Sequence, residues 1–171
     1  VAASTLEGER QMVAGSGGGG VDRLGGSGVE HLVGLARRRG HWDEPVWRDR
    51  LMALHAEERI RHWTNLRVTA AVKAGGTPGP AASIGKVVQG DLNQRIQEAA
   101  ADLLGADATA WEGDWVSDMP FEVAGMIRSR ANTIEGGTSE VNRNVLGERV
   151  LGLPREPDPF HGTPWRDVPR S

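Results

Sequence analysis

Residues 82–104 read ASIGKVVQGDLNQRIQEAAADLL, and this stretch decides the fold class. Its apolar residues recur three or four positions apart, which places them on one face of an α-helix. Glycine and proline crowd residues 75–80 just before it, and Gly105 follows as a C-cap. We therefore expect one long amphipathic helix. Its apolar face consists of Ile84, Val88, Leu92, Ile96, Ala99 and Leu103.

The segments on both sides have the same spacing, and none alternates as a strand would. In residues 44–74, Pro45 suits the first turn of a helix. The expected apolar face of this helix consists of Trp47, Leu51, Leu54, Ile60, Trp63, Leu66 and Ala70. Residues 155–171 hold four further prolines and no periodicity, so we expect an extended, Pro-rich tail. The sequence therefore predicts an all-α chain. Its expected helices are residues 28–39, 44–74, 82–104, 120–134 and about 139–151.

The first 27 residues allow two interpretations. Residues 7–14 have a helical pattern, but residues 15–20 read GSGGGG and a second glycine pair follows at positions 25 and 26. Each glycine inside a helix costs about 1 kcal/mol relative to alanine, which favours a loop. The other interpretation is a helix that packs so closely against a neighbour that side chains do not fit. A phosphate-binding loop is disfavoured, because no strand precedes the glycines and no Lys-Ser or Lys-Thr follows them.

Composition excludes several classes of protein. The 171 residues carry a formal net charge of −3, which argues against nucleic acid or an anionic membrane as a partner. Cysteine is absent and the five histidines form no ligand motif, so we expect no metal site. No apolar run approaches the roughly 20 residues of a membrane span. We expect a soluble, cytoplasmic protein.

Residues 128–154, RSRANTIEGGTSEVNRNVLGERVLGLP, are the most specific part of the chain. They resemble the C-terminal signature of the acyl-CoA dehydrogenases, in which a helix ends in a glycine turn and a last helix ends in Glu-Arg-Val-Leu-Gly-Leu-Pro. Residues 82–105 and 5–10 (TLEGER) resemble two earlier helices of the same family, in the same order. The resemblance implies an all-α, up-down four-helix bundle over residues 1–154. It also makes the Gly-rich segment more helical than composition suggests.

The resemblance implies a flavoenzyme. Family members use FAD to desaturate an acyl-CoA thioester: a carboxylate removes the α-proton and the β-hydrogen leaves as hydride to the flavin. Many place that carboxylate in the glycine turn, where this chain has Gly136. Others place it on the first helix of this domain, immediately before an arginine, and here those positions are Glu9 and Arg10. We expect Glu9 to be the catalytic base, although an ordinary exposed charge pair explains the same two residues.

The glycine turn is the expected binding region. Glu135 is one residue from the vacated position, and a shift of one residue turns a helical side chain by about 100°, so it is not expected to act as the base. The resemblance assigns substrate binding to Arg10 and Gly136. The expected cofactor-binding residues are Gly137, Thr138, Ser139 and Glu140. Thr138 or Ser139 also suits a plain N-cap, with Glu140 favourable in the first helical turn, and the two roles are compatible.

Two regions depart from the family pattern. An Arg-x-x-Phe-Gly motif that reaches a neighbouring subunit's flavin is replaced by Arg37-Arg38-Arg39-Gly40-His41. A Gly-Gly-x-Gly turn is replaced by Gly105-Ala106-Asp107-Ala108. The arginines also suit the C-terminal turn of a helix, where cations are favourable. Either flavin binding is relaxed, or a different subunit supplies the missing parts.

Two functions therefore remain open. The first is the C-terminal part of an FAD-dependent acyl-CoA dehydrogenase, acting on a fatty or steroid-derived acyl-CoA. The second is a non-catalytic helical subunit that assembles with an active dehydrogenase. The chain begins at Val1 and contains neither of the family's two preceding domains, so we expect a piece of a larger enzyme. We also expect it to form a homo- or hetero-oligomer.

Overall fold

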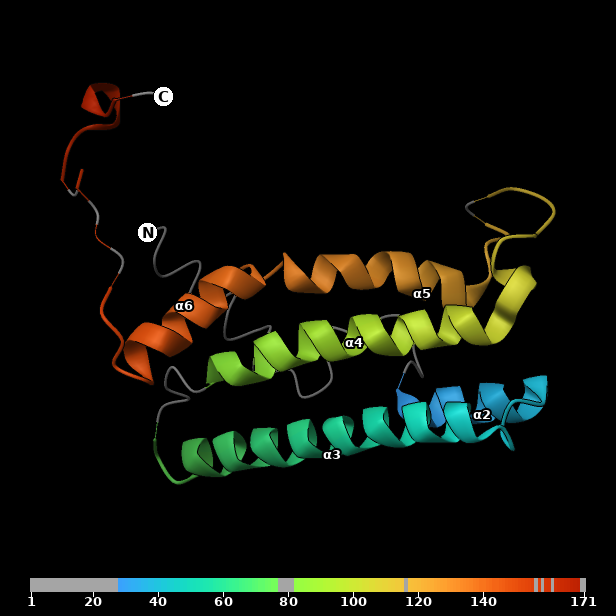
Figure 1. Cartoon of the computed structure of the whole chain (residues 1–171). Helices are drawn as coiled ribbons and strands as arrows, with labels where there is room; N and C mark the ends of the chain where they lie inside the picture. Colours follow the sequence, from blue (N-terminus) through green and yellow to red (C-terminus); the bar gives the residue numbers. More distant parts are fainter. Residues whose placement is uncertain are drawn as a thin grey trace.

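The computed structural model describes residues 28–76, 82–115, 117–155, 157, 159–160 and 162–169, which form α-helices, short 3₁₀ turns and loops, without a strand (Figure 1). The α-helices are α2 (Val29–Arg39), α3 (Pro45–Lys73), α4 (Ala82–Leu104), α5 (Phe121–Ser129) and α6 (Ser139–Arg149). The predicted all-α four-helix bundle is confirmed, and its fourth helical segment consists of two successive helices, α5 and α6. The 3₁₀ turns are η2 (Gly105–Ala108), η3 (Arg130–Thr133) and η4 (Trp165–Asp167).

Helix α4 lies at the centre of the bundle and contacts α2, α3, α5, α6 and η3. In Figure 1 it runs between α3 on one side and α5 with α6 on the other. Four of the six residues of its predicted apolar face are buried, namely Leu92, Ile96, Ala99 and Leu103, and Ile84 and Val88 are half-buried. The side chains that meet this face come from α2, α3 and α5. They are Leu32, Leu35, Ala36, Leu51, Leu54 and Val123.

The helix ends follow local signals in the sequence. Pro45 occupies the first turn of α3, as predicted. Gly40 ends α2 in the left-handed conformation, with φ of 80°. Helix α2 begins differently, because its N-cap is Gly28, which has no side chain to cap it. The backbone N–H of Val29 instead donates to Glu58 Oε1 at 3.3 Å, so a carboxylate of α3 caps the start of α2.

The expected register of α3 is correct in its first half and wrong in its second. Leu51 and Leu54 are buried, but Ile60, Trp63 and Leu66 are between 52% and 58% exposed. The reason is geometric. At about 1.5 Å per residue, the 29 residues of α3 extend about 44 Å, whereas the 11 residues of α2 extend about 16 Å. Most of the length of α3 therefore has no α2 beside it, and these three side chains are more than half exposed in the part of the chain that the structure describes.

Two further expectations need refinement. The helix predicted over residues 120–134 ends at Ser129 and continues as the 3₁₀ turn η3. Past Pro154, the tail contains the short turn η4. The expected helix over residues 7–14 and the Gly-rich segment lie outside the described residues. In the described part of the chain, no helix combines the length and apolar character that crossing a membrane requires.

Candidate functional site

The turn between η3 and α6 is formed by two glycines with left-handed backbones. Gly136 has φ of 69° and Gly137 has φ of 95°. A Cβ atom at position 137 would lie 3.2 Å from Asn142 Nδ2. Within the described residues, the backbone N–H groups of Gly136 and Gly137 donate to no protein acceptor. The turn therefore presents two adjacent, half-buried donors that suit an oxygen acceptor on a ligand.

Helix α6 begins at this turn and is capped as predicted. The Oγ1 of Thr138 accepts a hydrogen bond from the backbone N–H of Val141 at 3.3 Å. Asn142 Nδ2 donates to the carbonyl oxygens of Gly137 at 2.9 Å and Thr138 at 3.0 Å, which holds the turn against the helix. Of the two capping candidates, Thr138 is the cap and Ser139 is buried as the first helical residue.

Glu140 places a carboxylate at the N-terminus of α6. Its own backbone N–H and then the Thr138 hydroxyl stabilise the charged form, so they lower the pKa of the Glu140 carboxyl, with a smaller contribution from Arg143. The carboxylate is ionised at neutral pH. It makes the start of α6 less suited to a phosphate group and better suited to a neutral acceptor.

The segment before the turn is tied to α4 by polar side chains. Lys86 Nζ donates to the carbonyl oxygen of Asn132 at 2.6 Å. Asn93 Nδ2 donates to Asn132 Oδ1 at 2.8 Å, and both asparagines are buried. At Gly90 the two segments approach so closely that a Cβ atom would lie 3.2 Å from Asn132 O. Burial lowers the pKa of the Lys86 ammonium, while nearby Glu135 opposes that shift.

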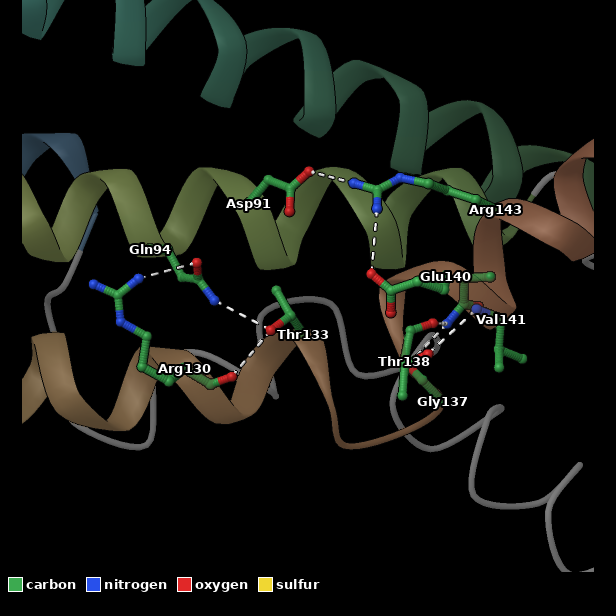
Figure 2. A network of polar contacts seen from close by, with 10 residues as sticks. Asp91, Gln94, Arg130, Thr133, Gly137, Thr138, Glu140, Val141 and Arg143 are labelled. Atoms are coloured by element: carbon green, nitrogen blue, oxygen red, sulfur yellow. Dashed lines mark hydrogen bonds and ion pairs between the residues drawn. The ribbon is translucent and has the colours of Figure 1, made fainter. Parts of the chain in front are cut away.

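The network continues on both sides of the turn, as Figure 2 shows. Before the turn, Gln94 Nε2 donates to Thr133 Oγ1 at 3.2 Å. After the turn, Arg143 Nη2 donates to Asp91 Oδ2 at 3.1 Å. Gln94 and Asp91 both belong to α4, so one helix fixes the two ends of the glycine turn.

Glu135 is held by its neighbours. Its carboxylate accepts hydrogen bonds from Arg128 Nη2 at 2.9 Å and 3.0 Å, and from Asn132 Nδ2 at 3.4 Å. This ion pair and hydrogen bond hold the Glu135 side chain against Arg128 and Asn132. That Glu135 is not the base stays a prediction.

The two regions that depart from the family pattern contact each other. Arg39 Nη1 lies 2.5 Å from Asp107 Oδ2, joining the end of α2 to η2. Arg37 places its guanidinium 4.6 Å from the ring centre of Trp42. Arg37 and Arg39 therefore both have partners within the chain. The three arginines lie in the last turn of α2, as the helix-dipole interpretation predicts.

The structure thus brings together five of the seven predicted site residues. Gly136, Gly137, Thr138, Ser139 and Glu140 form one continuous turn and helix start. Glu9 and Arg10 lie outside the described residues. Sequence reasoning missed the residues of the α4 network, Lys86, Asn93, Arg128 and Asn132. Polar residues that directly follow positions of the apolar face are the signal that could have found part of this network, since Asn93 follows Leu92, Gln97 follows Ile96, and both are buried.

A pocket of about 440 Å³ opens between α2 and α3 and contains none of the predicted site residues. It is lined by Gly28, Glu30, His31, Gly34, Arg38 and Glu58. The charges of this lining are mixed, and no group of three metal-binding side chains occurs among the described residues. The pocket therefore indicates no ligand class.

Comparisons with known proteins agree with the resemblance of the motifs. The profile of the family described as "Acyl-CoA dehydrogenase, C-terminal domain" matches residues 1–151. Acyl-CoA dehydrogenase IpdE1 of Mycobacterium tuberculosis is 33% identical over 136 residues, which cover 75% of this chain and 32% of that protein. The Mycolicibacterium smegmatis protein of the same name is 34% identical over 131 residues, covering 74% and 30%.

Solved structures give the same result. A structure described as Tcur3481-Tcur3483 steroid ACAD superposes with a TM-score of 0.68 and 26% identity, covering 88% of this chain and 38% of that one. A variant of the same protein superposes with the same TM-score and identity over 90% and 40%. This chain spans about a third of the length of the curated relatives it matches. The chain belongs to the acyl-CoA dehydrogenase family, and its residues 1–151 correspond to the C-terminal domain of that family.

Proposed function

We propose that this chain is the C-terminal part of an FAD-dependent acyl-CoA dehydrogenase that desaturates an acyl-CoA thioester between Cα and Cβ, with Glu9 as the catalytic base. The observation that carries the proposal is the glycine turn. Two backbone donors at Gly136 and Gly137, which have no acceptor among the described residues, adjoin the capped start of α6, in the segment that the family signature covers.

The residues of the turn fit a flavin ring better than its diphosphate. The N–H of Gly137 has no acceptor among the described residues and suits a ring carbonyl oxygen. The ionised Glu140 repels phosphate at the same place. We assign ring contact to Gly137, Thr138, Ser139 and Glu140. FAD supplies the hydride acceptor when it is bound.

This chain's own residues then divide the remaining tasks. The N–H of Gly136 binds the thioester carbonyl oxygen and stabilises the negative charge that grows there as the α-proton leaves. Glu9 accepts that proton, and Arg10 orients Glu9 or the substrate. The α4 network keeps the turn rigid, so its donors do not have to reorganise during the reaction.

For the substrate we propose a steroid-derived acyl-CoA. Solved relatives at 26% identity are described as steroid ACADs, and that description supports the class without fixing the ring system or chain length. The enzyme is proposed to act in the cytoplasm as an oligomer.

Replacing Glu9 tests the proposal in the intact enzyme that contains this chain. Glu9→Gln keeps the size of the side chain and removes the basic oxygen. We expect reduction of the flavin by acyl-CoA to slow by about 10²–10⁴-fold, with flavin content unchanged. Stopped-flow bleaching of the flavin measures the effect. Bleaching at the normal rate would remove Glu9 from the mechanism.

Two companion variants sharpen the test. Glu135→Gln should change the rate little, because that carboxylate is paired with Arg128. Gly136→Glu combined with Glu9→Gln should restore part of the activity if both positions face the same α-carbon. A large loss in Glu135→Gln with folding intact would instead identify Glu135 as the base.

A second candidate function is a non-catalytic subunit that assembles with an active dehydrogenase. The observation that favours it is the Arg39–Asp107 ion pair, which joins the two regions where the family contacts a neighbour's flavin. The two functions differ in flavin stoichiometry. One flavin per chain in the purified assembly supports the enzyme, and flavin bound only to a different subunit supports the structural role.

A further inference from the structure

Three buried side-chain amides, those of Gln97, Asn93 and Asn132, form one hydrogen-bonded row between α4 and η3. Gln97 Nε2 donates to Asn93 Oδ1 at 3.3 Å, and Asn93 Nδ2 donates to Asn132 Oδ1 at 2.8 Å. Asn132 Nδ2 then donates to Glu135 Oε1 at 3.4 Å. The three residues of this amide row are between 4% and 6% exposed. The row therefore leads from the interior of the bundle to the residue directly before Gly136.

The carboxylate at the end of the amide row fixes the direction of its bonds. Glu135 lies against Arg128 and offers acceptor atoms only, so Asn132 must turn its Nδ2 toward that carboxylate. The Oδ1 of Asn132 then points at Asn93, which must present its own Nδ2 in turn. An Asn132 amide rotated by half a turn would place acceptor against acceptor at Glu135 and donor against donor at Asn93. The row therefore holds Asn132 in one orientation.

Asn132 is also held through its backbone. Its carbonyl oxygen accepts a hydrogen bond from Lys86 Nζ at 2.6 Å. The same oxygen lies so close to Gly90 that a Cβ atom there would be 3.2 Å away. Lys86, Gly90 and Asn93 all belong to α4, so this helix fixes both the main chain and the side chain of Asn132.

The constraint reaches the glycine turn through Glu135. The planar peptide unit that carries the N–H of Gly136 also carries the carbonyl of Glu135, so holding Glu135 limits how that unit rotates. On the other side of the turn, Asn142 Nδ2 holds the carbonyl oxygen of Gly137 at 2.9 Å. The N–H of Gly136 thus lies between two points that asparagine side chains fix.

We propose that Asn132 is a positioning residue for the desaturation, acting through Glu135 to aim the N–H of Gly136 at the thioester carbonyl oxygen. The inference rests on the proposed function, which gives Gly136 that role. Glu135 has to keep an acceptor oxygen in place for Asn132, and it takes no proton.

Reversing the bond between Asn132 and Glu135 tests the proposal in the intact enzyme that contains this chain. Asn132→Asp keeps the size of the side chain but sets a second carboxylate against Glu135. Removing an oxyanion donor lowers kcat by about 10²–10³-fold, so misdirecting one should lower it by about tenfold or more. KM should change by less than about threefold, because the bond strengthens in the transition state.

The double variant Asn132→Asp with Glu135→Gln restores the bond with donor and acceptor exchanged, since the new amide donates to the new carboxylate. Its kcat should return to within about threefold of that of Glu135→Gln alone. A residue that serves only the packing of η3 on α4 would show no such rescue.

The carbonyl of a bound thioester reports the same hydrogen bond without turnover. An acyl-CoA with no α-hydrogen cannot be desaturated, and an isotope label identifies its carbonyl stretch in infrared difference spectra. The stretch should lie at higher frequency in Asn132→Asp than in the wild type, because a weaker hydrogen bond polarises the carbonyl less. The double variant should return the stretch to the wild-type frequency.

Two further variants separate positioning from stability. Glu98→Gln is the matched control, because it removes the ion pair between Arg130 of η3 and α4 and leaves the amide row intact. Its kcat and its carbonyl frequency should be normal. Asn93→Leu removes the donor to Asn132 without burying a charge, so it replaces Asn132→Asp if that variant does not fold. Its kcat should fall by about threefold or more. Urea unfolding confirms that each variant is folded.

The inference is overturned if a folded Asn132→Asp or Asn93→Leu has normal kcat, if the double variant shows no recovery, or if the carbonyl frequency does not move. Failure of the proposed function gives a different result, because the wild-type enzyme itself would then not reduce its flavin with acyl-CoA. Normal flavin bleaching in Glu9→Gln, together with the expected losses and rescue at Asn132, would remove Glu9 as the base and support Asn132 as a positioning residue.

Discussion

Residue 137 requires a backbone conformation that an L side chain adopts only at a cost. Gly137→Ala should destabilise the chain by about 1–2 kcal/mol, because φ of 95° is unfavourable for alanine and the new Cβ meets Asn142. Gly147→Ala should stabilise it by about 0.5–1 kcal/mol, since Gly147 lies inside α6 and its Cβ would make an ordinary 3.4 Å contact with Leu153. Urea unfolding of both variants measures the difference. The reverse order would contradict the assigned turn.

The same scale shows what a sequence can reveal about the site. Thr138 was predictable as a cap, because a cap bonds to a residue three positions away. The bond between Asn93 and Asn132 was not, because 39 positions separate the two residues and only packing of α4 against η3 brings them together. Local hydrogen bonds leave a local pattern, whereas bonds between elements depend on the tertiary structure.

At the scale of an element, the start of α6 responds to pH through Glu140. Its carboxyl has a lower pKa in the folded chain than the unperturbed value of 4.5. The stabilising contribution is therefore complete above about pH 4.5 and is lost as the pH falls through the folded-state pKa. The melting temperature of Glu140→Gln should lie below that of the wild type at pH 7, and the two should converge under acid.

Thermal melts between pH 3 and pH 7 follow this difference, with Glu112→Gln as the control. Glu112 is exposed and lies outside the helices, so its substitution should leave the melting temperature unchanged at both acidic and neutral pH. If the melting temperatures of Glu140→Gln and the wild type differed by the same amount at every pH, ionisation of this carboxyl would not stabilise α6.

The ends of the helices were more predictable from the sequence than the side that each helix buries. Glycine and proline mark the ends of α2, α3 and α4, so their predicted limits lie within one residue of the observed ones. The face that α3 buries was not predictable throughout. Leu51 and Leu54 face the core, whereas Ile60 and Trp63 have the same helical spacing on the opposite side. Periodicity identifies an apolar face but does not say whether another part of this chain covers it.

For the whole molecule, ion pairs connect α4 to the elements around it. Asp102 pairs with Arg50 of α3, Glu98 with Arg130 of η3, and Asp91 with Arg143 of α6. Each pair is largely exposed, so each should contribute at most about 1 kcal/mol and should be screened by salt. Raising NaCl from low concentration to about 1 M should therefore lower the free energy of unfolding.

Asp102→Asn should reduce this salt dependence. Arg149→Gln is the matched control, because Arg149 is exposed and has no carboxylate partner among the described residues. Urea titrations at low and high salt compare the three proteins. Equal salt dependence in Asp102→Asn and the wild type would mean that the Asp102 pair does not contribute.

The carboxylate that caps α2 also bears on the order of folding. Glu58 lies 29 positions after Val29, whose N–H it accepts, so the first turn of α2 gains its cap only when α3 has formed and docked. A nascent chain that has emerged only as far as α2 lacks that residue. The amide of Val29 should therefore become protected from hydrogen exchange together with the amides of α3, although it precedes them in the chain. The first described helix thus obtains its N-terminal cap from the helix that follows it in the chain.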